Sequence, residues 1–252
     1  MLNIFHYLLI ALGINILMFI PAFKYKTDKL TDLSYALTFI ILIILALLLK
    51  QLTITKLILT LMILAWGLRL GIFLFIRIRK MKKDKRFDGM RESFFRFLKF
   101  WTLQGLAVWV ILIPALFFIN SNINKIIWLG FFIWAIGLVI ESIADLQKYR
   151  FKQDKKNKDK FIQEGIWKYS RHPNYFGEIL CWIGVYIFVF TSLTSFQKII
   201  GLVSPLFIII LLLFVTGLPM LEKYADKKWG KQKNYQEYKK KTSILIPWIP
   251  KK

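Results

Sequence analysis

A polar decapeptide, YSRHPNYFGE at residues 169–178, stands directly before the apolar run ILCWIGVYIFVF. It gathers a guanidinium, an imidazole, an amide and a carboxylate, at Arg171, His172, Asn174 and Glu178. Pro173 suits the first position of a helix, because its missing N–H group needs no partner there. Asn174 and Glu178 then lie one turn apart on one helix face. Backbone N–H groups at a helix start favour an anion, so this segment predicts an anion-binding site rather than a simple cap.

Three more charged residues lie in apolar surroundings. Glu141 and Asp145 are four residues apart at the end of one apolar segment, so they share a helix face. They are functional candidates, with an internal salt bridge as the alternative. Arg69 either snorkels to the membrane surface or points into a protein-lined cavity and meets an anionic group. Gly67 and Gly71 flank it and would let another helix approach closely.

The elements that position these groups are membrane helices. The chain has 252 residues, of which 57% are hydrophobic, and several apolar runs are long enough to cross a bilayer as a helix. We expect seven spans, at residues 4–22, 33–49, 57–76, 101–119, 126–145, 174–191 and 199–219. This pattern predicts an all-α, polytopic membrane helix bundle in a single integral membrane domain, 1–252.

Basic residues gather in alternate connections. Segments 23–32, 77–99, 147–173 and the tail from 220 hold 32 Lys and Arg, against Lys50, Lys56, Lys125 and Lys198 in the other connections. The positive-inside rule then places the amino terminus outside and the carboxyl terminus in the cytoplasm. Topology and attraction to anionic lipid explain the net charge of +23, so we expect a lipid-bilayer partner and no nucleic acid.

Three further features of the sequence exclude a cleaved signal peptide, an internal disulfide and a metal site as expectations. Residues 1–22 lack the basic start and small-residue site of a cleaved signal peptide, so we expect an uncleaved first span. Cys181 is the single cysteine, and the two histidines, His6 and His172, are far apart. We therefore expect neither an internal disulfide nor a metal site.

Four segments together carry a family resemblance: DLQKYRFK, GIWKYSRHPNYFGEILCWIG, TGLPMLEKYADKKWG and YQEYKKKTSILIPWIP. They resemble the carboxyl-terminal half of the steroid 5-alpha-reductase superfamily, most closely its bacterial branch of uncharacterised, DUF1295-like membrane proteins. The resemblance covers about residues 140–250, and GLRLGIFLF around Arg69 also fits. The RHPNY-x-GE segment alone is also similar to isoprenylcysteine and phospholipid methyltransferases, whose matching half holds S-adenosylmethionine.

The reductase resemblance implies NADPH as cofactor, held by residues 126–252, with residues 1–120 on the substrate side. The implied cofactor-binding residues are Asp145, Lys152, Lys160, Tyr169, Arg171, His172, Asn174, Tyr175, Glu178, Tyr224 and Tyr235. Asn174 and Glu178 match positions by the nicotinamide end, and Lys152 and Lys160 match positions near the phosphates. The site would face the cytoplasm of a bacterial inner membrane.

The chain departs from the steroid enzymes in its amino-terminal half, which has no acidic residue within the hydrocarbon region of the first three spans. Arg69 and Tyr35 are the candidate catalytic groups there. We therefore expect a membrane oxidoreductase that reduces an activated C=C bond of a lipophilic steroid-, sterol- or isoprenoid-like substrate. The alternatives are a methyltransferase that uses S-adenosylmethionine and a non-enzymatic lipid-binding or scaffold protein.

Overall fold

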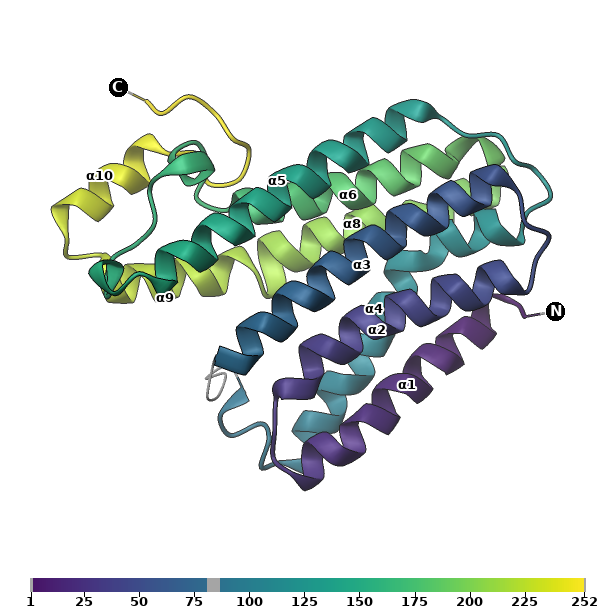
Figure 1. Ribbon diagram of the computed structural model, residues 1–252, viewed down its shortest axis with the longest axis horizontal. Coiled ribbons are helices and arrows are strands. Elements are labelled where there is room, and N and C mark those ends of the chain that lie inside the picture. The colour runs from purple at the N-terminus through teal and green to yellow at the C-terminus, as the bar shows by residue number, and fades with distance from the viewer. Residues whose placement is uncertain (1, 81–86, 252) are drawn as a thin grey trace. The chain divides into compact units, whose positions relative to one another are not determined.

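The computed structural model describes residues 2–80 and 87–251, and its regular elements are helices (Figure 1). The first six long helices are α1 (Ile4–Lys24), α2 (Lys29–Leu48), α3 (Ile54–Lys80), α4 (Phe94–Asn120), α5 (Trp128–Gln153) and α6 (Pro173–Val189). Short 3-10 turns are η2 (Lys155–Asn157), η3 (Gly165–Lys168) and η4 (Phe190–Ser192). The rest comprises α7 (Ser195–Gly201), α8 (Val203–Ile210), the π-helical turn η5 (Leu211–Val215), α9 (Leu218–Trp229) and α10 (Lys233–Lys241).

Seven of these stretches are long and apolar enough to cross a membrane, which confirms the predicted all-α, seven-span architecture. The seventh candidate span is the interrupted stretch Ser195–Trp229. Two boundaries differ from the prediction. The helix α4 begins at Phe94, before the predicted span 101–119, and α5 continues to Gln153, beyond the predicted span 126–145. The predicted basic connection 77–99 includes residues 81–86, which lie outside the described residues.

The chain divides into two compact units. Residues 1–127 and 189–204 form the first unit, and residues 128–188 and 205–252 form the second. The prediction of a single domain with a substrate half and a cofactor half stays a prediction.

Side-chain amides join three helices of the first unit. Asn15 on α1 donates to Thr38 Oγ1 on α2 at 3.1 Å, and Gln104 on α4 donates to Asn15 Oδ1 at 2.9 Å. Such hydrogen bonds hold helices together in lipid, where apolar contacts alone give little preference. In α3, Gly67 packs on Ile40 and Gly71 on Ala36, so the predicted close approach of another helix is confirmed.

Glycines bring α5 and α6 together in the second unit. A Cβ atom added to Gly177 would lie 2.6 Å from both Glu141 N and Gly137 O. Gly184 and Gly130 meet in the same way two turns further along the helices. The glycine of the YFGE motif is therefore required by helix packing, and this packing places the start of α6 beside the buried Glu141.

The seventh span breaks before α9. The π-helical turn Leu211–Val215 ends in a hydrogen bond from Thr216 N to Leu211 O, and α9 starts at Leu218 with Pro219 in its first turn. A Cβ atom on Gly217 would meet Leu212 O at 2.2 Å and the Tyr175 ring at 2.8 Å. Only glycine fits there, so the break packs directly against the first turn of α6.

Candidate functional site

The loop between α5 and α6 is packed rather than loose. The Trp167 indole donates to Ala144 O at 3.1 Å, and Ile166 N donates to Gln147 Oε1 at 3.0 Å. Ala144, Ile162 and Trp167 form a small buried apolar cluster. These contacts hold the loop along the end of α5 and so fix the chain that leads into Arg171 and His172.

Glu222 on α9 binds the two basic residues that precede α6. One carboxylate oxygen lies 2.8 Å from His172 Nε2, and the other pairs with the Arg171 guanidinium. Lys239 on α10 lies 3.6 Å from that second oxygen. The segment before α6 and the distant helices α9 and α10 therefore meet at one carboxylate.

Burial sets the protonation of this cluster. His172 is 5% exposed, and burial lowers the pKa of its imidazole below the usual value, although Glu222 opposes the shift. Burial also raises the pKa of the Tyr235 and Tyr238 phenols well above their usual range. At neutral pH the phenols therefore stay protonated, and Tyr238 donates to Trp167 O at 2.6 Å.

A cavity of about 310 Å³ opens beside this cluster. Its six basic side chains are Lys148, Lys152, Lys158, Lys160, Arg171 and Lys228, and its acidic ones are Asp159 and Glu222. Ligand pockets of roughly 300–1,000 Å³ are typical of small-molecule sites. The excess of positive charge favours a ligand with several negative charges.

Aromatic side chains also form part of the cavity wall. Phe161 lies edge-to-face with Trp229 and Tyr235, at ring-centroid distances of 5.8 and 5.1 Å. Asp159 fixes this wall, because its carbonyl accepts from the Trp229 indole at 2.6 Å and its carboxylate pairs with Lys228 at 2.9 Å. Flat rings beside basic side chains suit a ligand that combines a ring system with phosphate groups.

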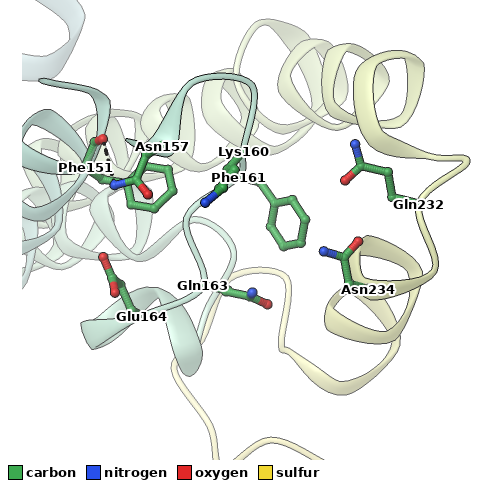
Figure 2. Close-up of a pocket in the computed structure, with 8 residues that line it drawn as sticks. All are labelled: Phe151, Asn157, Lys160, Phe161, Gln163, Glu164, Gln232 and Asn234. Atoms are coloured by element: carbon green, nitrogen blue, oxygen red, sulfur yellow. Dashed lines mark hydrogen bonds between the residues drawn. The ribbon is translucent and has the colours of Figure 1, made fainter. Parts of the chain in front are cut away.

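A second, smaller pocket of about 200 Å³ adjoins the cavity (Figure 2). Its carboxamides are Asn157, Gln163, Gln232 and Asn234. Figure 2 shows the Phe161 ring between the loop that carries Gln163 and the segment that carries Gln232 and Asn234. Lys160 and Phe161 line both pockets. The smaller pocket therefore extends the basic cavity with neutral hydrogen-bonding side chains.

The predicted cofactor residues fall into two groups. Those that line the cavity are Lys152, Lys160, Arg171, His172, Tyr224 and Tyr235. Those outside its lining are Asp145, Tyr169, Asn174, Tyr175 and Glu178. The Tyr175 ring stacks on the His172 ring at 5.8 Å, and Asn174 Oδ1 is buried and makes no hydrogen bond within the described part of the chain.

The two candidate catalytic residues belong to the first unit. Arg69 is half-buried on α3. Tyr35 lies on α2, and its ring packs edge-to-face on Phe39 at 5.1 Å. Their predicted roles stay predictions.

Sequence reasoning missed several residues of the cavity, among them Lys158, Phe161, Glu222, Lys228, Trp229 and Tyr238. A signal for part of this set was present. Glu222, Ala225 and Trp229 recur at spacings of three and four, so they share one face of a short helix.

The seven apolar helices make this chain a multi-pass integral membrane protein. Residues 18–242 match the family described as "Protein of unknown function (DUF1295)", so the chain belongs to the DUF1295 family. A stretch of 52 residues, 21% of the chain, is 38% identical to the "Probable O-methyltransferase ustE" of Ustilaginoidea virens. That match spans 18% of the methyltransferase's length. No solved structure matches the chain.

Proposed function

We propose that this protein is a membrane oxidoreductase that uses NADPH to reduce an activated C=C bond of a lipophilic substrate. The observation that carries the proposal is the cavity beside Arg171 and His172, with six basic side chains against two acidic ones and an aromatic wall. A dinucleotide with a ribose phosphate carries several negative charges and two ring systems. Basic and aromatic groups of this kind suit both features.

The side chains divide the binding task. Lys158, Lys160 and Lys228 would hold phosphate groups, and Arg171 would present a planar fork to a further one. Tyr224, which is 60% exposed at the cavity, offers a flat surface to a ring. When bound, NADPH supplies the hydride.

The residues at the start of α6 would orient the nicotinamide ring. The resemblance to steroid 5-alpha-reductases assigns Asn174 and Glu178 to the nicotinamide end. The Oδ1 atom of Asn174 is buried and makes no hydrogen bond within the described residues, so it can accept one from the amide N–H group of a nicotinamide. Such positioning can supply several kcal/mol of the barrier reduction, on the order of effective-molarity effects.

We place the lipophilic substrate among the first four spans, with Arg69 and Tyr35 as the groups that polarise it. Turnover by an Arg69→Ala protein at the parent rate would remove Arg69 from this assignment. The distribution of basic residues supports a cytoplasmic position for the cofactor cavity, and we propose a bacterial inner membrane as its location.

The second candidate is a methyltransferase that uses S-adenosylmethionine. The partial match to the "Probable O-methyltransferase ustE" favours it. Charge favours the reductase, because S-adenosylmethionine carries a sulfonium cation and a single carboxylate, which six basic side chains would serve poorly.

The test is ligand binding to the detergent-purified protein, with NADPH, NADH and S-adenosylmethionine compared by thermal shift and calorimetry. We expect NADPH to stabilise the protein most and S-adenosylmethionine to leave its melting temperature unchanged. Stabilisation by S-adenosylmethionine alone would overturn the reductase and support the methyltransferase. Stabilisation by none of the three would support a non-enzymatic lipid-binding or scaffold role.

A further inference from the structure

The carboxyl-terminal strap, defined as residues 242–251, is fixed against the chain that leads into α6. Arg171 N donates to Ser243 O at 2.8 Å. Further along the strap, Trp248 N donates to Tyr169 O at 3.0 Å. Ser170 adds a side-chain hydrogen bond to the strap at 2.7 Å. Lys251 N also donates back to Lys241 O at 3.0 Å, so the strap is a closed loop held at several points rather than a loose end.

Large apolar side chains of this loop are exposed. The exposed fractions of Ile244, Ile246 and Trp248 are 44%, 58% and 72%. The intervening Leu245 and Pro247 are only partly exposed. Ile249 follows at 77%. The strap therefore exposes a row of four large apolar side chains within residues 244–249, which is unusual for a surface that faces water.

The position of the strap relates this row to the bilayer. Pro173 is the first residue of a candidate membrane span, and the strap bonds to Tyr169, a few residues earlier. Residues just outside a spanning helix lie at the headgroup level, where tryptophan is enriched. An apolar row at this depth is placed to contact lipid.

The charges beside the row fit an anionic surface. Lys168, Lys240, Lys241 and Lys251 are exposed around the strap. Residues 240–251 contain no Asp or Glu. Cations close to an anionic leaflet are attracted to it, whereas two identical straps would repel each other. The charge pattern thus favours lipid over a second copy of the chain.

We propose that the strap docks on the anionic leaflet of the membrane that holds this protein, with Ile246, Trp248 and Ile249 at the boundary between headgroups and acyl chains. Docking also steadies Tyr169 and Arg171, because the strap is hydrogen-bonded to both. The cavity is thereby tied to the lipid surface. This inference does not depend on the proposed reductase activity.

The test uses the protein's own cysteine content. Cys181, the single cysteine, is 1% exposed, so a thiol dye on an Ile249→Cys protein reports the strap alone. A Glu237→Cys protein, labelled on the exposed side of α10, is the matched control. Both proteins are placed in nanodiscs of phosphatidylcholine with or without phosphatidylglycerol. Quenching is measured with iodide in the water and with a nitroxide-labelled lipid, in the absence of any cofactor.

We expect the lipid-borne quencher to act more strongly at position 249 than at 237, and iodide to act more weakly there. Omission of phosphatidylglycerol should reduce these differences between the two positions. The double variant Lys240→Gln, Lys241→Gln should do the same, since docking weakens about fivefold per lysine. Equal iodide quenching at 249 and 237 in both lipid mixtures would overturn the proposal. Shielding from both quenchers that vanishes when each nanodisc holds one chain would also overturn it, because a second copy would then cover the strap.

Discussion

His172 Nε2 lies 2.8 Å from Glu222 Oε1, which joins the residue before α6 to the first turns of α9. A carboxylate only accepts hydrogen bonds, so the Nε2 atom of the imidazole carries the proton in this pair. The other oxygen of Glu222 pairs with Arg171. The seventh span breaks at Gly217. Beyond this break, the Glu222 carboxylate holds α9 to the start of α6.

Glu222→Gln should therefore destabilise the protein. The amide leaves the Arg171 guanidinium, which is 11% exposed, without its counter-ion beside several lysines. Breaking a partly buried pair in this way costs about 2 kcal/mol, less than the loss of a fully buried one. The measurement is thermal or urea unfolding of the detergent-purified protein.

Asp226→Asn is the matched control for that variant. Asp226 lies one turn further along α9, is 46% exposed, and pairs with Lys239 at 2.6 Å. Exposed pairs contribute about 0–1 kcal/mol, so its loss should change stability little. Equal losses in the two variants would mean that Glu222 holds the site no more firmly than an ordinary surface carboxylate.

Stability should fall as the pH drops through the titration of His172. Burial holds the pKa of this imidazole below its usual value, so the unfolded chain takes up the proton more readily than the folded one. The contribution is complete above about pH 6.5, the usual histidine pKa, and is lost as the pH falls towards the lower folded value. His172→Gln should flatten the unfolding free energy over this window. An unchanged slope in the variant would show that other groups set it.

The sequence predicted the parts of the fold that depend on local patterns. Apolar runs gave the seven spans, and Pro173 is the first residue of α6 as expected. The break near Gly217 was only partly predictable. Pro219 signals an interruption, but neither the π-helical turn before it nor the close contact between Gly217 and Tyr175 follows from a local sequence pattern.

The site was harder to predict because it is assembled from distant segments. Arg171 and His172 stood out by residue type, whereas Glu222, their partner, looked like an ordinary residue of a basic tail. The hydrogen bonds that join the strap to Tyr169 and Arg171 use backbone atoms and leave no pattern of side chains in the sequence. Such pairings follow from the tertiary fold alone.

Gly177→Ala tests why the YFGE motif contains glycine. The new methyl group would lie 2.6 Å from the backbone of both Glu141 and Gly137, and neither can move without separating α5 from α6. We expect a loss of about 3 kcal/mol or failure to accumulate in the membrane. Gly13→Ala is the control, because nothing lies within 4 Å of its added methyl group. That variant should be neutral or gain up to about 1 kcal/mol from helix propensity. Similar behaviour of the two proteins would contradict the packing at Gly177.

Lys160→Gln tests whether the basic cavity holds the phosphates of NADPH. Lys160 lines both the cavity and the adjoining amide-rich pocket. An exposed lysine that meets a phosphate contributes up to about 1 kcal/mol, so we expect the Kd to rise about fivefold. The affinity should also become less sensitive to salt, since one screened attraction is lost. Lys155→Gln is matched in charge and in loop, but Lys155 lies outside the cavity lining. Calorimetric titrations of both variants with NADPH at two salt concentrations are the measurement. An equal rise of the Kd in both variants would indicate general electrostatic attraction rather than a phosphate contact at Lys160.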